Sequence, residues 1–181
     1  MKRLVLILAI VAIATGSVLT QTRTADLPRQ VKAGDVVPLG DGLTIKVTQS
    51  TKSPFASVKT KGEPVVVSLE LDALKKPISM SYKLSADSKT SDIYLTGGTT
   101  RIGPSAVLED FPSWGKDNDK EVEVLDAKAN SGGGTVDFEG KGSISLVFDV
   151  PAVLGKTPKK ISIILRTLKP VDQLYSLVVN L

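Results

Sequence analysis

Apolar and polar residues alternate along most of this chain, and that period of two restricts the folds it can adopt. Successive side chains of a β-strand point to opposite faces, so each alternating segment would bury one face and expose the other. The clearest segments are 43–48, 65–72, 143–150, 160–165 and 175–181. Weaker strands are predicted at 82–86, 92–96, 121–125 and 135–138. The pattern therefore predicts an all-β fold.

Turn-forming residues separate these segments and indicate how the strands are arranged. Glycine and proline clusters fall at 40–42, 61–64, 97–98, 131–134 and 140–142. About eight or nine short strands with uneven connections favour an antiparallel β-sandwich over a barrel. The stretch 97–120 has no clean period and is predicted to be a long irregular connection, with an edge strand as an option at Ile102 and 106–108. The predicted core comprises Ile45, Val47, Val67, Leu69, Leu146, Phe148, Ile161, Ile163 and Val179.

The N-terminus has the three parts of a secretory signal peptide. Lys2 and Arg3 precede an apolar run from Leu4 to Ala14, and small or polar residues follow. The run is about half of the ~20 residues that a membrane-spanning helix needs, so we expect cleavage, with an uncleaved membrane anchor as the alternative. The cut site stays open between 14–16 and 20–22.

The predicted organisation is a signal peptide at 1–22, an exposed leader at 23–31 and one β-sandwich domain at 32–181. We expect a bacterial exported protein that is periplasmic or extracellular, and one that meets the membrane only if the N-terminal segment is uncleaved.

Composition excludes several chemistries. The chain has no histidine and no cysteine, which removes Ser-His-Asp and thiol catalysis and imidazole or thiolate metal sites. Two carboxylate pairs, Glu109 with Asp110 and Asp137 with Glu139, are the glycosidase candidates, but an aromatic content of 4% offers little for stacking sugars. We therefore expect a protein that is not an enzyme and has no cofactor.

Charge gives little reason to expect nucleic acid as a partner. The net charge is +4, but Lys2, Arg3 and Arg23 lie in or beside the signal segment, and the remaining 20 basic residues nearly balance 19 acidic ones. A DNA-binding domain would carry a clustered basic face.

Acidic residues gather between Glu109 and Asp126, where seven acidic and two basic residues leave a net charge of −5. We expect a strand here to turn Val122 and Val124 inward. If that strand extends back to Asp117, four carboxylates of one parity face solvent together. These four are Asp117, Asp119, Glu121 and Glu123. Two interpretations stay open: a charged edge that blocks sheet aggregation, or a calcium site built from oxygen ligands.

Phe111 and Trp114 are the candidate partner-binding residues. Both lie in the irregular stretch, which has Pro104 and Pro112 to restrict its backbone. Large aromatic side chains anchor many protein interfaces. The alternative for Trp114 is that it folds back and caps one end of the sandwich.

Four segments together resemble the bacterial exported immunoglobulin-like domains typified by the mycobacterial secreted immunoprotective antigen. They are 33–37, 42–47, 65–71 and the Gly-to-Phe-Asp-Val-Pro element at 142–151. The resemblance covers 32–181 and implies an immunoglobulin-like sandwich in the envelope or outside the cell, without catalytic residues. The predicted function is a non-catalytic exported domain that binds a protein or a cell-envelope component. The alternative is a calcium-stabilised or ligand-binding β-domain that uses the acidic residues.

Overall fold

A computed structural model describes residues 27–50, 55, 57–112, 122–126 and 132–181. The segment predicted to be a signal peptide and residues 23–26 of the predicted leader lie outside these residues. The described residues form eleven strands and a short 3₁₀ turn, η1 (Ala152–Leu154), with no α-helix, so the predicted all-β class is confirmed. The strands are β1 (Arg29–Lys32), β2 (Val36–Gly40), β3 (Leu43–Ser50), β4 (Glu63–Lys83), β5 (Ile93–Gly97), β6 (Thr100–Ile102), β7 (Ala106–Asp110), β8 (Val122–Val124), β9 (Gly133–Val150), β10 (Lys159–Lys169) and β11 (Gln173–Asn180).

The strands join in one continuous sheet with the main order β1-β11-β10-β4-β9-β7-β8. Four more strands lie off this path: β2 pairs with β3, β3 with β4, and the β5–β6 hairpin with β10. The sheet is mixed, because β1 runs parallel to β11 while the other pairs are antiparallel. The fully antiparallel arrangement that the alternation predicted is therefore wrong at β1.

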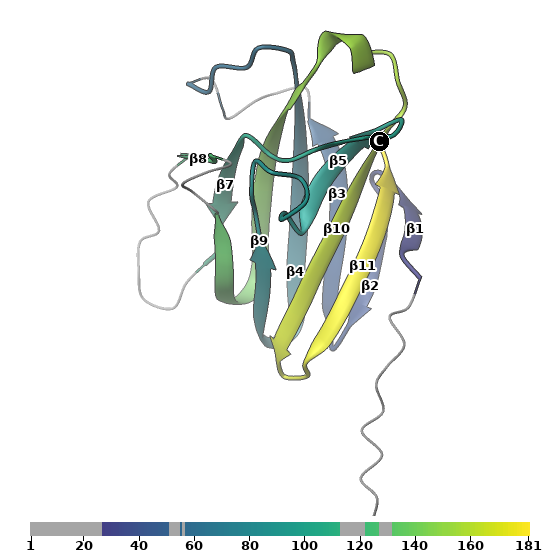
Figure 1. The fold of residues 1–181 in the computed structure, drawn as a ribbon. Coiled ribbons are helices and arrows are strands. Elements are labelled where there is room, and N and C mark those ends of the chain that lie inside the picture. The colour runs from purple at the N-terminus through teal and green to yellow at the C-terminus, as the bar shows by residue number, and fades with distance from the viewer. Residues whose placement is uncertain (1–26, 51–54, 56, 113–121, 127–131) are drawn as a thin grey trace, which may run out of the picture.

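Two long strands bend and carry the sheet from one layer into another. The first half of β4 pairs with β3, its last residues pair with β10, and β9 follows it along both halves. The β4–β9 register shifts between Ala73 and Ile78, so four β4 residues bulge out opposite Glu139. Figure 1 shows the resulting arrangement, with β10 and β11 in front of β2 and β3.

This bend corrects the predicted turn at 140–142. Gly140 has a φ of +75°, which suits glycine, and it lies within β9 opposite the bulge. The chain bends there and continues as a strand. Two glycines on either side of a lysine suit the tip of a hairpin and also a bend within a strand, because both structures need the backbone freedom of glycine.

The alternating residues meet in one core that both layers share. All nine predicted core residues are at most 3% exposed. Residues of β3, β4, β9, β10 and β11 belong to the same buried cluster. The core prediction is confirmed, and each of these strands contributes alternate residues to it.

A second, smaller cluster lies on the outer face of the sheet. Val66, Ala106 and Val147 come from three neighbouring strands, and Phe55 packs over them. Ala106 and Val107 are therefore buried on opposite faces of β7, at 0% and 1% exposure. A strand that is buried on both faces does not alternate between apolar and polar residues, so β7 lacks the pattern by which the other strands were predicted. The predicted irregular stretch in fact contains β6 and β7, and β7 lies inside the sheet between β9 and β8.

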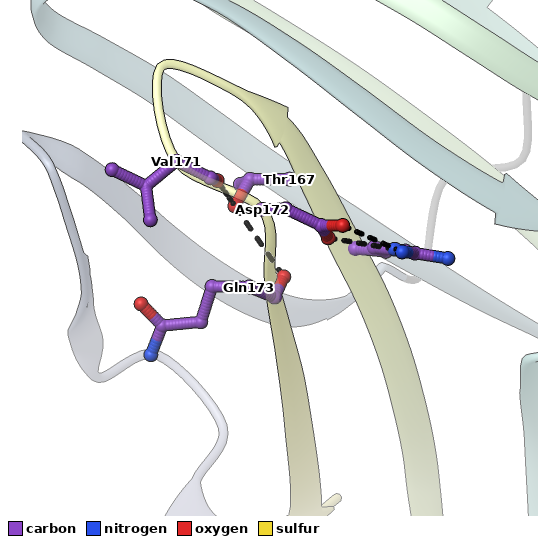
Figure 2. A network of polar contacts seen from close by, with 5 residues as sticks. Thr167, Val171, Asp172 and Gln173 are labelled. Carbon is purple, nitrogen blue, oxygen red and sulfur yellow. Dashed lines mark hydrogen bonds and ion pairs between the residues drawn. The ribbon is translucent and has the colours of Figure 1, made fainter. Parts of the chain in front are cut away.

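Side-chain hydrogen bonds fix the turn between β10 and β11 (Figure 2). Thr167 Oγ1 donates to the carbonyl oxygen of Val171 at 2.8 Å, with a longer 3.4 Å contact to that of Gln173. Arg166 forms a two-bond ion pair with Asp172, at 2.7 and 2.6 Å. The turn is thereby closed by one buried hydroxyl and one exposed charge pair. None of the described residues forms a helix with the length and apolar character needed to cross a membrane.

Candidate functional site

A groove crosses the outer face of the sheet, where β2, β3, β4, β9 and β7 lie side by side. It encloses about 370 Å³. Its lining combines small residues such as Thr44, Gly142 and Ser143 with longer charged side chains. The full lining is Val36, Thr44, Lys46, Glu70, Leu71, Asp72, Asp110, Lys141, Gly142 and Ser143.

Charges of both signs line this groove in adjacent positions. Lys46 Nζ lies 3.4 Å from Glu70 Oε2, and both side chains are substantially exposed. Asp72 of β4 is the register partner of Lys141 of β9. Directly opposite residues of an antiparallel pair project from the same face, so a ligand in the groove meets lysines and carboxylates together.

The groove was not predicted from the sequence. Its side chains are the polar halves of the alternating strands, which read as ordinary solvent-facing residues. Opposite charges on residues that pair across strands could have revealed it. Finding such pairs requires knowing which residues face each other, and the sequence alone does not supply that register.

A second polar group lies on the core-facing side of β4 and β7. Tyr82, near the end of β4, is 4% exposed, and its hydroxyl donates to Glu109 Oε1 at 2.7 Å. Glu109 pairs with Ile144, which is fully buried, so its side chain shares the core-facing side of β7. A half-buried carboxylate thus points inward between Val107 and Phe111.

Burial controls the ionisation of this pair. It raises the pKa of Glu109, the Tyr82 hydroxyl lowers it, and the charge of Glu123 raises it. Burial also raises the pKa of Tyr82, with smaller contributions from the charge of Glu109 and from the hydrogen bond to it. The tyrosine therefore stays a neutral donor, and the carboxyl holds its proton to higher pH than an exposed glutamate.

The two carboxylate pairs considered for a glycosidase lie on different strands, Glu109 and Asp110 on β7 and Asp137 and Glu139 on β9. The β7 pair does not share one site. Glu109 and Asp110 are consecutive strand residues, so they project to opposite faces: Glu109 toward the core and Asp110 into the outer groove. Asp137 and Glu139 are both exposed and flank buried Phe138 on β9. Neither of them lines the outer groove.

Of the four carboxylates proposed for calcium, Glu123 alone is described, and it is exposed on β8. Asp117, Asp119 and Glu121 lie outside the described residues. The predicted inward direction of Val122 and Val124 is wrong: Val122 packs on the outer cluster and Val124 is 58% exposed. Glu123 pairs instead with buried Val107, on the side of Glu109. Within the described residues, no group of three or more acidic side chains could hold a metal ion.

The aromatic candidates also separate. Phe111 is 5% exposed, and its ring lies 5.0 Å from that of Phe138 in a tilted arrangement. The structure thus places Phe111 in the core, where a docking partner would reach little of it. Trp114 lies outside the described residues, so both of its predicted roles stay predictions.

No family model and no curated protein sequence matches the chain. Among solved structures, the chain is similar to Spo0M, the sporulation control protein of Bacillus subtilis, with a TM-score of 0.33 and 13% sequence identity. The alignment covers 77% of this chain and 50% of Spo0M, so this chain spans about half the length of that protein. A match this loose assigns neither a fold nor a function here.

Proposed function

We propose that this protein is an exported, non-catalytic binding domain with an immunoglobulin-like sandwich architecture, and that it binds a protein partner in the outer groove. The observation that carries the proposal is the groove itself, a hollow of about 370 Å³ on the face of a well-packed sheet. A rigid sheet with an open polar face suits recognition, because its side chains are held in place before a partner arrives.

The mixed charge of the groove favours a protein over other partners. Lys46 and Lys141 would repel a cationic ligand, while Glu70 and Asp72 would repel a polyanion. A protein segment that carries both lysine and carboxylate side chains can complement both signs in one register. Thr44 and Ser143 add hydroxyls that both donate and accept hydrogen bonds.

The export and architecture parts of the proposal have separate support. The basic and apolar N-terminal residues support export to the periplasm or the cell exterior. The shared core of residues from both halves of the bent β4–β9 pair supports a two-layer sandwich. The absence of histidine and cysteine from the sequence leaves few routes to catalysis and agrees with a binding role.

The test fills the groove. Ser143→Trp places a large ring at a half-buried lining position, and Ser176→Trp makes the same change at a half-buried outward position of β11. We expect the full-length chain and Ser176→Trp to capture the same partner from detergent-solubilised cell envelopes, and Ser143→Trp to lose it while keeping its melting temperature. Equal capture by all three chains would contradict docking in the groove.

A further inference from the structure

The layer formed by β10 and its neighbours carries a line of cations that the groove does not include. Five residues are register partners in sequence across five strands, each pairing with the next: Lys32, Asn180, Lys160, Thr96 and Arg101. Paired residues project from the same face, so all five side chains lie on one surface. We call this line the cationic row. Its three cations and Asn180 are exposed, and Thr96 is half-buried.

The row has a regular geometry that follows from the sheet. Neighbouring strands lie about 4.8 Å apart, so the cations, which occupy alternate strands, are spaced by about 9.6 Å at the backbone. Lys32 belongs to β1, Lys160 to β10 and Arg101 to β6. An amide and a hydroxyl fill the positions between them. The row therefore offers hydrogen-bond donors continuously along a line of about 19 Å.

The surroundings of the row keep it positive. The neighbouring line of register partners, Gln30, Val178, Ser162 and Tyr94, carries no charge. The Arg101 guanidinium lies 4.8 Å from the centre of the Tyr94 ring, which holds this cation against the sheet. Like-signed charges without acidic neighbours in the same line or the next create a positive potential that attracts anions.

Two nearby carboxylates are engaged in backbone hydrogen bonds. Asp35 accepts from the Lys32 N–H at 3.3 Å, and Asp92 accepts from the Lys83 N–H at 2.7 Å. Asp92 lies immediately before β5, four residues before Thr96. Neither carboxylate belongs to the row.

We propose that the cationic row binds the phosphates of an extended polyphosphodiester chain of the cell envelope, a partner that rests on the proposed export of this protein. A line of charges fits a chain polymer, whereas a membrane surface would engage a broad patch. Phosphate suits both kinds of cation in the row, because lysine binds it as a point charge and the planar fork of arginine matches the geometry of its oxygens. The contact with Tyr94 holds the Arg101 guanidinium in place in the row.

The experiment measures binding of fluorescent poly(glycerol phosphate) to the full-length chain by anisotropy, at low and at physiological salt. Three phosphate contacts predict a slope of log affinity on log salt of about −2, by analogy with single-stranded nucleic acids. Lys160→Glu and Arg101→Glu should each weaken binding about 25-fold, because each reversal changes the charge by two units at about fivefold per unit.

Two controls separate this proposal from the groove. Lys75→Glu reverses an exposed lysine in the bulge of β4 and should bind the polymer like the unchanged chain. Ser143→Trp should also bind it normally, so failure of the groove proposal leaves this result intact. Failure of export would change the location of the protein in cells and not its affinity for the polymer.

Several results would overturn the proposal. They are no saturable binding at low salt, equal affinity of the row variants and the unchanged chain, equal binding of a polyuronate of matched charge density, or binding of anionic lipid vesicles in place of the polymer. Circular dichroism checks that the charge-reversed chains are folded. If Lys160→Glu fails to fold, Lys160→Gln, which removes one charge, should weaken binding about fivefold.

Discussion

At the residue scale, the Tyr82–Glu109 pair is the feature with the clearest energetic consequence. Burial is the largest influence on Glu109 and raises its pKa above the ordinary value of 4.5. A raised pKa means that the folded chain holds the proton more tightly than the unfolded chain. The resulting stability is fully present below pH 4.5 and is lost as the pH rises through the folded-state pKa.

We therefore predict that Glu109→Gln stabilises the protein at neutral pH. The amide oxygen of glutamine still accepts from the Tyr82 hydroxyl, and no charge has to be buried. Thermal unfolding of both chains between about pH 4 and pH 8 should give similar melting temperatures at the acid end and a growing advantage for the variant above it. Glu139→Gln, at an exposed position of β9, controls for the loss of one negative charge. A variant that melts below the unchanged chain at pH 7 would contradict this.

At the element scale, the contact between β9 and the end of β7 depends on a glycine. A Cβ at Gly142 would collide with the ring of Phe111, which also packs on Phe138. Gly142→Ala should therefore destabilise the fold by about 1–3 kcal/mol, the usual cost of forcing extra volume into a packed core.

The same contact predicts a rescue. Phe111→Leu alone should lose stability through reduced packing, but Gly142→Ala should cost less in that background because the smaller side chain can move aside. A double-mutant cycle by chemical denaturation measures this coupling, which is typically about 0.5–3 kcal/mol between residues in contact. Additive effects of the two substitutions would show that Phe111 and Gly142 do not constrain each other.

The elements also show what the sequence can and cannot supply. Segments with one buried face, such as 43–48 and 160–165, were predictable, because burial on one side imposes the period of two. β7 was predicted only as an optional edge strand, since the outer cluster buries its second face and removes the alternation there. The sequence predicted a turn at Gly140, where the strand in fact bends, because glycine adopts the backbone conformation that both a turn and such a bend require. The direction of Glu109 and the lining of the groove depend on register, which pairing between distant strands decides.

At the scale of the whole molecule, the bent β4–β9 pair should make the two layers unfold together. β4 contributes Val67 to one layer and Met80 to the other, and both are fully buried. Native-state hydrogen exchange should give the amides of these two residues the same free energy of opening, equal to that of global unfolding. A lower value for either residue, with its layer opening alone, would contradict the coupling.

The proposed binding of a partner on the outer face of β3, β4 and β9 can be tested in living cells. A photo-crosslinking amino acid is placed at position 143 of the full-length chain and, in a matched chain, at position 176. Residue 143 lines the groove and residue 176 lies on β11. We expect one discrete crosslinked protein from position 143 and none from position 176. The same product from both positions, or none from position 143, would contradict binding in the groove.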